Sequence, residues 1–387
     1  MSNLSYLEKL LDGVEVEWNQ LGELSALRRG RVMSKGYFVD NIGDYPVYSS
    51  QTANDGKIGS IDTFDFDGEF ISWTTDGANA GTVFYRTGKF SITNVCGLIK
   101  IKNESLLNYK YLFYWLTIEA KKHVYSGMGN PKLMSHQVEK IPVPIPCPDN
   151  PEKSLAIQSE IVRILDKFTA LTAELTAELT AELNMRKKQY NYYRDQLLSF
   201  EEGEVEWKAL GKIAEINTGQ KPSEILDTEA EFDYINAGTT RSGYCSLSNC
   251  EGDTVTTPSR GQGGIGFVGY QNKSFWLGPL CYKIRSIDNK VLINKYLFYI
   301  LQSKNQLLLG LKKEGGVPAV NKSDLAKLEV PVPSVTEQER IVEILDKFDT
   351  LTTSLQEGLP REIELRQKQY EYYRDLLLSF PKSDEAA

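Results

Sequence analysis

Residues 160–171 read EIVRILDKFTAL, and residues 340–351 read RIVEILDKFDTL. Residues 186–200 read RKKQYNYYRDQLLSF, and residues 366–380 read RQKQYEYYRDLLLSF. Both pairs match at one offset of 180 residues without a gap, which chance does not produce. Self-similarity at a fixed period indicates a repeated structural unit. The chain of 387 residues is therefore predicted to be a tandem duplication.

The first copy of this repeat has the pattern of a long helix. Its apolar residues recur at alternating steps of four and three, which is a heptad seam; they are Ile157, Ile161, Ile164, Phe168, Leu171 and Leu175. Asn150 followed by Pro151 predicts the start of the helix, as N-cap and first helical residue. The tetrapeptide Thr-Ala-Glu-Leu then occurs three times in succession, over residues 172–183.

The second copy is predicted to be a similar but interrupted helix. Thr336 and Glu339 predict a capping box at its start, and Gly358 with Pro360 predicts a break. Two helices with matching apolar faces predict an antiparallel pair within the chain. An ordinary helical hairpin would explain these helices equally well.

The duplication extends into the segments before each helix. The stretch GVEVEWNQLGEL (13–24) matches GEVEWKALGKI (203–213), and KYLFYWL (110–116) matches KYLFYIL (295–301). Each segment ends in a Val-Pro run, at 143–146 and 330–333. Between these matches, residues 36–107 and 220–292 diverge; both are rich in Gly, Thr and aromatic residues and predict short strands with tight turns. The expectation is two α+β units, each with a helical half, that present different surfaces on one frame.

Composition limits the class of protein. The chain is 41% hydrophobic and 25% charged, which is ordinary for a globular protein. It has no apolar run that could span a bilayer and no signal-peptide pattern. Its five cysteines form no CxxC pair, which favours a cytoplasmic location. The net charge is −8, so binding to nucleic acid would need a local basic surface or help from partners.

The repeated ILDKF and QYxYYRDxLLSF blocks, the GEVEW and Val-Pro segments and the Thr-Ala-Glu-Leu run together resemble the specificity subunit of type I restriction–modification systems. The resemblance covers the whole chain. It implies an α+β fold with two pseudo-symmetric target recognition domains separated by two long helices packed as an antiparallel coiled coil. The domains would span 1–146 and 201–334, with helical regions over 147–200 and 335–387.

The same resemblance implies a subunit without catalytic residues. No metal site is expected either, because the only histidines, His123 and His136, have no Cys or carboxylate at a suitable spacing. Each recognition domain would read one half of a split double-stranded DNA target. The helices would dock two methyltransferase subunits, through which restriction subunits join. S-adenosylmethionine, ATP and Mg would belong to those partners and none of them to this chain.

Candidate DNA contacts are basic and polar residues in or beside predicted loops, because Lys and Arg contact phosphates and Arg, Gln and Asn read base edges. In the first unit they are Arg28, Arg29, Arg31, Lys35, Thr74, Thr75, Asn79, Arg86 and Lys132, of which Thr74 to Arg86 fall in a predicted glycine-rich loop, 72–86. In the second unit they are Lys221, Arg260, Gln262, Lys312, Lys313 and Asn321. For each residue, a solvated surface position is the alternative.

Candidate subunit contacts lie on the repeat helices. They are Leu175, Leu179, Leu183, Tyr190, Tyr193, Tyr370 and Tyr373. Tyrosines of this kind favour interfaces, although they could equally seal the helices against the globular units. Two other functions stay open: a structural coiled-coil adaptor whose globular units bind proteins, and an oxidoreductase using the glycines at 261, 263 and 266. The second is disfavoured, because no strand–helix pattern surrounds the glycines.

Overall fold

The computed structural model describes residues 6–127, 129–201, 203–261, 263–313, 317–354 and 357–381. The chain forms two compact units, each of which contains segments from both halves of the sequence. Unit 1 comprises Met1–Ala177 with Glu364–Ala387, and unit 2 comprises Glu178–Ile363. Both divisions fall within helices, so the predicted domain boundaries stay a prediction.

The helices confirm most of the sequence reading. Helix α6 (Pro151–Leu197) is continuous over 47 residues, with Asn150 Oδ1 accepting from the Lys153 amide at 3.0 Å as predicted for an N-cap. The second copy is split into α11 (Val335–Thr353) and α12 (Leu359–Leu377), so the predicted break is also confirmed. The predicted capping box at Thr336 is wrong. Ser334 is the N-cap instead, because its side chain accepts from the Glu337 amide.

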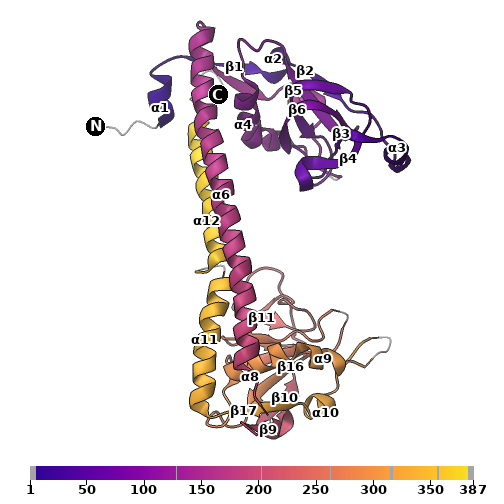
Figure 1. The fold of residues 1–387 in the computed structure, drawn as a ribbon, viewed down its shortest axis with the longest axis vertical. Coiled ribbons are helices and arrows are strands. Elements are labelled where there is room, and N and C mark those ends of the chain that lie inside the picture. The colour runs from indigo at the N-terminus through magenta and orange to yellow at the C-terminus, as the bar shows by residue number, and fades with distance from the viewer. Residues whose placement is uncertain are drawn as a thin grey trace. The chain divides into compact units, whose positions relative to one another are not determined.

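Each unit pairs helix segments from different copies of the repeat (Figure 1). In unit 1 the first part of α6 runs antiparallel to α12: Thr169 bonds to Tyr370, and Phe168 stacks on Tyr373. In unit 2 the last part of α6 lies against α11, where Tyr193 stacks on Phe348. The predicted antiparallel coiled coil is therefore present within each unit.

The globular part of unit 1 is built around a six-stranded sheet in the order β2-β7-β5-β6-β3-β4. Its strands are β2 (Ser25–Arg29), β3 (Ile42–Tyr48), β4 (Lys57–Ile61), β5 (Phe66–Thr74), β6 (Val83–Ile92) and β7 (Cys96–Ile101). A separate ribbon joins β1 (Val16–Gln20) to β8 (Pro142–Pro146). The remaining helices are α1 (Tyr6–Leu11), α2 (Leu21–Leu24), α3 (Lys35–Asp40), α4 (Tyr109–Glu119) and α5 (Ser135–Val138), with 3-10 turns η1 (Ala53–Gly56) and η2 (Ala120–His123).

Unit 2 repeats this plan with a smaller sheet. Strands β10 (Ala214–Thr218), β13 (Thr254–Pro258), β14 (Gly269–Gln271) and β16 (Cys281–Ser286) form a sheet in the order β10-β16-β13-β14. Strands β11 (Phe232–Ile235), β12 (Tyr244–Cys245) and β15 (Trp276–Leu277) form a second one, and β9 (Glu206–Ala209) pairs with β17 (Glu329–Val332). The helices are α7 (Leu210–Ile213), α8 (Asn294–Ser303), α9 (Asn305–Gly310) and α10 (Lys322–Leu325).

Matching contacts show that the two units share one frame. Trp18 faces Pro144 in the ribbon of unit 1, and Trp207 faces Pro331 in that of unit 2. Helices α4 and α8 carry the KYLFY motif. In each, a buried tyrosine donates to a ribbon carbonyl: Tyr111 to Pro144 O at 2.7 Å and Tyr296 to Pro331 O at 3.1 Å.

The core of unit 1 includes the buried residues of α4 and α6 together with Leu377, Leu378 and Phe380 from the end of the chain. The core of unit 2 includes α8, α11 and Leu198. Each core therefore contains residues from both a globular segment and its helices. In the described part of the chain, no helix is both long and apolar enough to cross a membrane.

Candidate nucleic-acid interface

Three loops of unit 1 meet where β5 ends. The loop after β5 is bonded to the segment before α5, through Gly77 N to Pro131 O at 3.0 Å and Leu133 N to Thr75 O at 2.9 Å. It is also bonded to the β3–β4 loop, through Asn79 Nδ2 to Ser50 O at 3.1 Å. Of the candidate contacts, this arrangement brings Asn79 and the exposed Lys132 together.

The basic residues after β2 lie close to these loops. Arg29 pairs with Gly97 and Thr74 pairs with Cys96, so β2 and β5 both end beside the start of β7. Arg28 and Arg29 are exposed and, being consecutive in a strand, point to opposite faces of the sheet. Lys35 is exposed at the start of α3.

Arg31 is already engaged by an ion pair. Its Nε lies 2.9 Å from Asp65 Oδ2, and a second nitrogen donates to the Tyr37 hydroxyl. The hydrogen bond to Asp65 raises the pKa of the Arg31 guanidinium further above its usual value. About two fifths of the side chain is exposed, so a phosphate could still approach it.

The expected loop over residues 72–86 is wrong at both ends. Thr74 is the last residue of β5, and Arg86 lies inside β6. Thr74, Thr75 and Arg86 are all buried, Arg86 to 5% exposure. The misassignment arose because residues 70–74 of β5 are buried in succession, and such a run lacks the alternation that identifies a half-exposed strand.

Arg86 is an internal support for the β3–β4 loop. It donates to Ser72 Oγ at 3.0 Å and to the Asp55 carbonyl at 2.6 Å, and its guanidinium lies 3.6 Å from the centre of the Tyr48 ring. Burial lowers its pKa, although nearby Tyr48 partly opposes this. Thr74, Thr75 and Arg86 are therefore not retained as DNA contacts.

Unit 2 brings the corresponding loops together. Val320 N donates to Ser259 O at 2.9 Å, which matches the bond between Leu133 and Thr75 in unit 1. A Cβ on Gly264 would lie 2.0 Å from the Ala237 carbonyl oxygen, so the β11–β12 loop packs directly on the loop after β13. Arg260 and Lys313 both bridge to Ala319 and so lie on either side of it.

The candidate DNA contacts of unit 2 differ in their exposure and in their bonding partners. Lys313 Nζ lies 2.9 Å from Asp324, and this hydrogen bond lowers the pKa of the Asp324 carboxyl. Asn321 Nδ2 contacts the same carboxylate at 3.4 Å. Lys221 is exposed and Lys312 is half-buried. Gln262 lies outside the described residues.

The structure adds a pair of loops that the sequence reading missed. The β11–β12 loop holds exposed Thr239, Thr240 and Arg241 at the mouth of a cleft of about 620 Å³ that Gln271 and Asn272 also line. The Arg241 guanidinium lies 4.5 Å from the Tyr244 ring centre, with Asp233 3.5 Å away.

The counterpart in unit 1 is the β3–β4 loop, with Gln51, Thr52 and Asn54. An offset of 187 residues aligns Gly56 with Gly243, both in the left-handed region, with φ of 81° and 138°. The alignment of these two glycines is the sequence pattern that could have identified the two loops as equivalent.

The candidate subunit contacts divide into two groups. Tyr193, Tyr370 and Tyr373 contact the partner helix of their pair. Tyr190 lies near Phe348 of α11 and also donates to Gln302 of α8 at 3.0 Å. Their neighbours Tyr192 and Tyr372 are 61% and 62% exposed and pack edge-on against Tyr193 and Tyr373. Leu175, Leu179 and Leu183 are half-buried on α6. In unit 1 an apolar groove of about 390 Å³ adjoins the tyrosines, lined by Tyr6, Leu7, Ile164, Phe168, Tyr373, Leu376 and Leu377.

The glycines at 261, 263 and 266 lead into the short strand β14 and not into a helix. This agrees with the prediction that they do not form a dinucleotide site. Among the residues described, no group of three or more His, Cys, Asp or Glu side chains could hold a metal ion.

Known proteins resemble the chain along its length. Residues 14–185 and 202–365 match the family model described as the type I restriction modification DNA specificity domain. The specificity subunit of the type I restriction enzyme EcoR124I/EcoR124II from Escherichia coli is 41% identical, and the alignment covers 99% of both chains.

Two solved structures share the fold. One is the S subunit of a type I restriction–modification system from M. genitalium, with 18% identity, a TM-score of 0.53 and coverage of 96% of this chain and 98% of the other. The other comes from work on complex assembly and conformational transition of the type I system, with 16% identity, a TM-score of 0.63 and coverage of 94% and 97%.

Proposed function

The chain belongs to the type I restriction–modification DNA specificity family, and from this premise we propose that it is a non-catalytic subunit that selects the DNA target of a type I complex. Unit 1 reads one half of a bipartite duplex site, and unit 2 reads the other. The adaptor alternative is not favoured, because the family match covers both globular segments.

One observation carries this proposal: equivalent loops on a shared frame hold different side chains. At the β3–β4 position unit 1 has SSQTANDG (49–56), whereas unit 2 has NAGTTRSG (236–243). Arg pairs bidentately with guanine, and Asn or Gln with adenine. Two such loops on one duplex would select two different half-sites.

Phosphate contacts would come from the exposed basic residues beside these loops. In unit 1 they are Arg28, Arg29 and Lys132, and in unit 2 they are Arg260 and Lys221. Sequence-independent affinity depends on such contacts. Because the whole chain carries a charge of −8, stable binding would need further basic surface from partner subunits.

The partners would be two methyltransferase subunits, which carry S-adenosylmethionine. Restriction subunits, which use ATP and Mg, would join through them. The repeat supports a count of two, because the same exposed tyrosine pair occurs once in each unit, at Tyr192–Tyr193 and at Tyr372–Tyr373. Identical docking patches suit two copies of one partner.

The test is to map methylated adenines by long-read sequencing, in a methylation-deficient strain that expresses this chain with its methyltransferase. A bipartite motif with an unspecified gap is expected. Arg241→Ala should alter one half-site only, whereas Lys132→Ala should weaken methylation of every target equally, since phosphate contacts are not base-specific. A contiguous motif, or no methylation at all, would contradict the proposal.

A further inference from the structure

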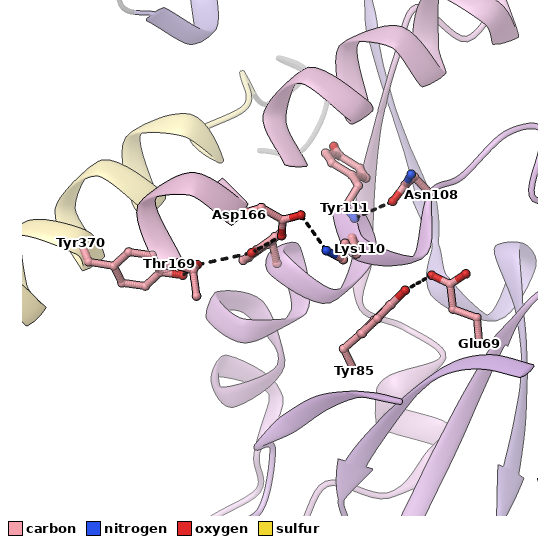
Figure 2. Close-up of polar contacts among 9 residues, drawn as sticks. Glu69, Tyr85, Asn108, Lys110, Tyr111, Asp166, Thr169 and Tyr370 are labelled. Carbon is pink, nitrogen blue, oxygen red and sulfur yellow. Dashed lines mark hydrogen bonds and ion pairs between the residues drawn. The ribbon is translucent and has the colours of Figure 1, made fainter. Parts of the chain in front are cut away.

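A cluster of polar side chains connects the globular part of unit 1 to its helices. Asp166 on α6 has one carboxylate oxygen 2.6 Å from Lys110 Nζ, and its other oxygen accepts from the Tyr114 hydroxyl at 2.7 Å. Lys110 and Tyr114 both lie on α4, and Figure 2 shows Lys110 paired with Asp166. The Tyr114 oxygen is also 3.3 Å from Thr169 Oγ1, which donates to Tyr370 of α12 at 3.1 Å. Asp166 is therefore linked directly to α4, and Thr169, three residues further along α6, is bonded to α12.

Unit 2 contains the same cluster, built from the second copy of each motif. Lys295 Nζ lies 3.3 Å from Asp346 Oδ1, and the Tyr299 hydroxyl donates to that oxygen at 2.5 Å. Burial raises the pKa of the Tyr299 hydroxyl, and the bond to Asp346 adds to this. The nearby Asp349 takes the place of Thr169, and burial raises the pKa of its carboxyl, although Lys295 opposes this. The Lys–Asp–Tyr set is therefore common to both units.

A second attachment lies two helical turns earlier on each helix. Gln158 is fully buried, accepts from the Asn108 amide at 2.9 Å and donates to Leu106 O at 2.9 Å. Gln338 does the same with Ile293 and Val291, each at 2.9 Å. With a single attachment, α4 could pivot on α6, and α8 could pivot on α11. Two attachments at different points along α6 or α11 fix the angle between the two helices.

The lysine of each cluster also lies near a tyrosine of its unit's larger sheet. In unit 1 this sheet carries the β3–β4 loop, and in unit 2 it carries the loop after β13, on which the β11–β12 loop packs. Lys295 Nζ is 4.3 Å from the ring centre of Tyr270 on β14, and Lys110 Nζ is 5.9 Å from that of Tyr85 on β6. The hydroxyl groups of Tyr270 and Tyr85 are in turn bonded to Asp253 and Glu69. In each unit the lysine thus lies between the repeat helix and a strand of the sheet.

We propose that Asp166 and Asp346 are positioning residues that hold each recognition domain at a fixed angle to its helix, and so determine how strictly the complex enforces the spacing between half-sites. The inference rests on the proposed function. It concerns the spacing of the two half-sites and not their sequences.

The two attachments differ in what their removal would do. Gln158 and Gln338 are fully buried, so replacing them would leave backbone groups without partners and destabilise folding. The Asp166 and Asp346 side chains are 38% and 46% exposed, and their ion pairs are partly screened. Replacing the aspartates should loosen the angle while the unit stays folded.

The experiment uses the full-length chain in complex with its methyltransferase. Methylation rates are measured on duplexes that carry the native half-sites with the native gap and with gaps one base pair shorter or longer. For Asp166→Asn and for Asp346→Asn, discrimination against the wrong gaps should fall about fivefold, as expected for a partly exposed charged pair. Discrimination against single base changes within either half-site should stay as in the unchanged chain.

Three further variants complete the test. Tyr114→Phe should relax spacing in the same direction, and Asp166→Glu should restore part of the discrimination because it keeps the charge. Glu343→Gln is the matched control, since it removes the same charge from a pair with Lys347 that lies wholly on the exposed face of α11; its spacing preference should not change.

Unchanged spacing discrimination in both aspartate variants would overturn the inference. So would equal losses of spacing and half-site discrimination, or a large fall in the thermal unfolding midpoint, because each would indicate a structural role. Failure of the proposed function is a separate result, since the unchanged complex would then show no bipartite target.

Discussion

Phe168 and Tyr373 stack with ring centres 5.6 Å apart and planes 4° from parallel. At the positions 180 residues away in the repeat, Phe348 and Tyr193 also stack, at 5.6 Å and 28°. The ILDKF block of each copy therefore packs on the YYRD block of the other copy. Neither unit can form its helix pair from one half of the sequence alone.

The first prediction concerns how much the stacking of Phe168 on Tyr373 contributes to the stability of the chain. Phe168→Ala and Tyr373→Ala should each destabilise the chain, and a double-mutant cycle should give a coupling of about 1 kcal/mol, typical of an aromatic pair. Urea denaturation of the three variants measures it. Tyr372→Ala is the control, because Tyr372 is 62% exposed and packs edge-on against Tyr373, outside the stacked pair. Additive effects of Phe168→Ala and Tyr373→Ala would show that the stacking contributes nothing.

The second prediction concerns the Thr-Ala-Glu-Leu repeats, which lie within the uninterrupted helix α6. Removing residues 179–182 shortens a helix by about 6 Å and turns it by about 40°. One base pair rises about 3.4 Å and turns about 34–36°. The deletion should therefore shorten the unspecified gap by one or two base pairs and leave both half-sites unchanged, as methylation mapping would show.

A two-residue deletion, Thr180 with Ala181, is the control for this prediction. It turns the helix by about 200° and so should abolish methylation instead of changing the gap. Altered half-site sequences at an unchanged gap would rule out a spacing role for the repeats.

The third prediction concerns the exposed tyrosines. Tyr192→Ala and Tyr372→Ala should each remove one methyltransferase subunit, giving a one-to-one complex, and the double variant should bind neither. Exposed aromatic residues carry much of the energy at protein interfaces. Native mass spectrometry gives the stoichiometry directly. Ile42→Ala, at an apolar residue that is 78% exposed on β3, should keep two methyltransferases; two bound copies in the double variant would place the docking surface elsewhere.

The fourth prediction concerns alkaline pH. Complete burial raises the pKa of the Tyr111 hydroxyl well above its usual value, and burial raises that of Tyr296 too. A folded pKa above the unfolded value of about 10 means that stability is full below pH 10 and is lost as the pH rises beyond it. Each tyrosine should reduce the free energy of unfolding by up to about 1.4 kcal/mol per pH unit above pH 10.

Tyr111→Phe tests this directly. The variant should be less stable at neutral pH, because the Pro144 carbonyl loses its donor, but its stability should fall less steeply above pH 10. Urea denaturation at several pH values between about 8 and 11 compares the slopes, with the exposed Tyr372→Phe as control. Equal slopes for Tyr111→Phe and the unchanged chain would contradict the prediction.

Much of the helical architecture could be predicted because helices depend on local patterns. The heptad seam from Ile157, the cap at Asn150 and the break at Gly358 each rest on residues within a few turns of one another. The prediction of a capping box at Thr336 was wrong because the local pattern offers two possible caps. Ser334, two residues earlier, is an equally good cap, and only the backbone shows which of them is used.

The candidate DNA contacts were harder to predict. Thr74 and Arg86 look like loop residues among glycines, but strands β5 and β6 extend through them and bury them. Burial depends on neighbours distant in sequence, such as Asp55, whose carbonyl accepts from Arg86. The β3–β4 and β11–β12 loops were missed because only the sheet brings them to the other candidates.

The sequence by itself determined that the chain is a duplication with two similar globular frames, two different sets of loops, one long helix in the first copy and an interrupted helix in the second. Only the tertiary structure decided which helix segment packs on which. The repeated blocks are nearly identical, so local pattern cannot distinguish a partner in the same copy from one in the other. Phe168 and Tyr193 are 25 residues apart on one continuous helix and thus about 38 Å apart, too far to touch. The two blocks of the first copy therefore cannot pair with each other. In the structure each packs on a block of the second copy, and that exchange joins the two halves of the chain.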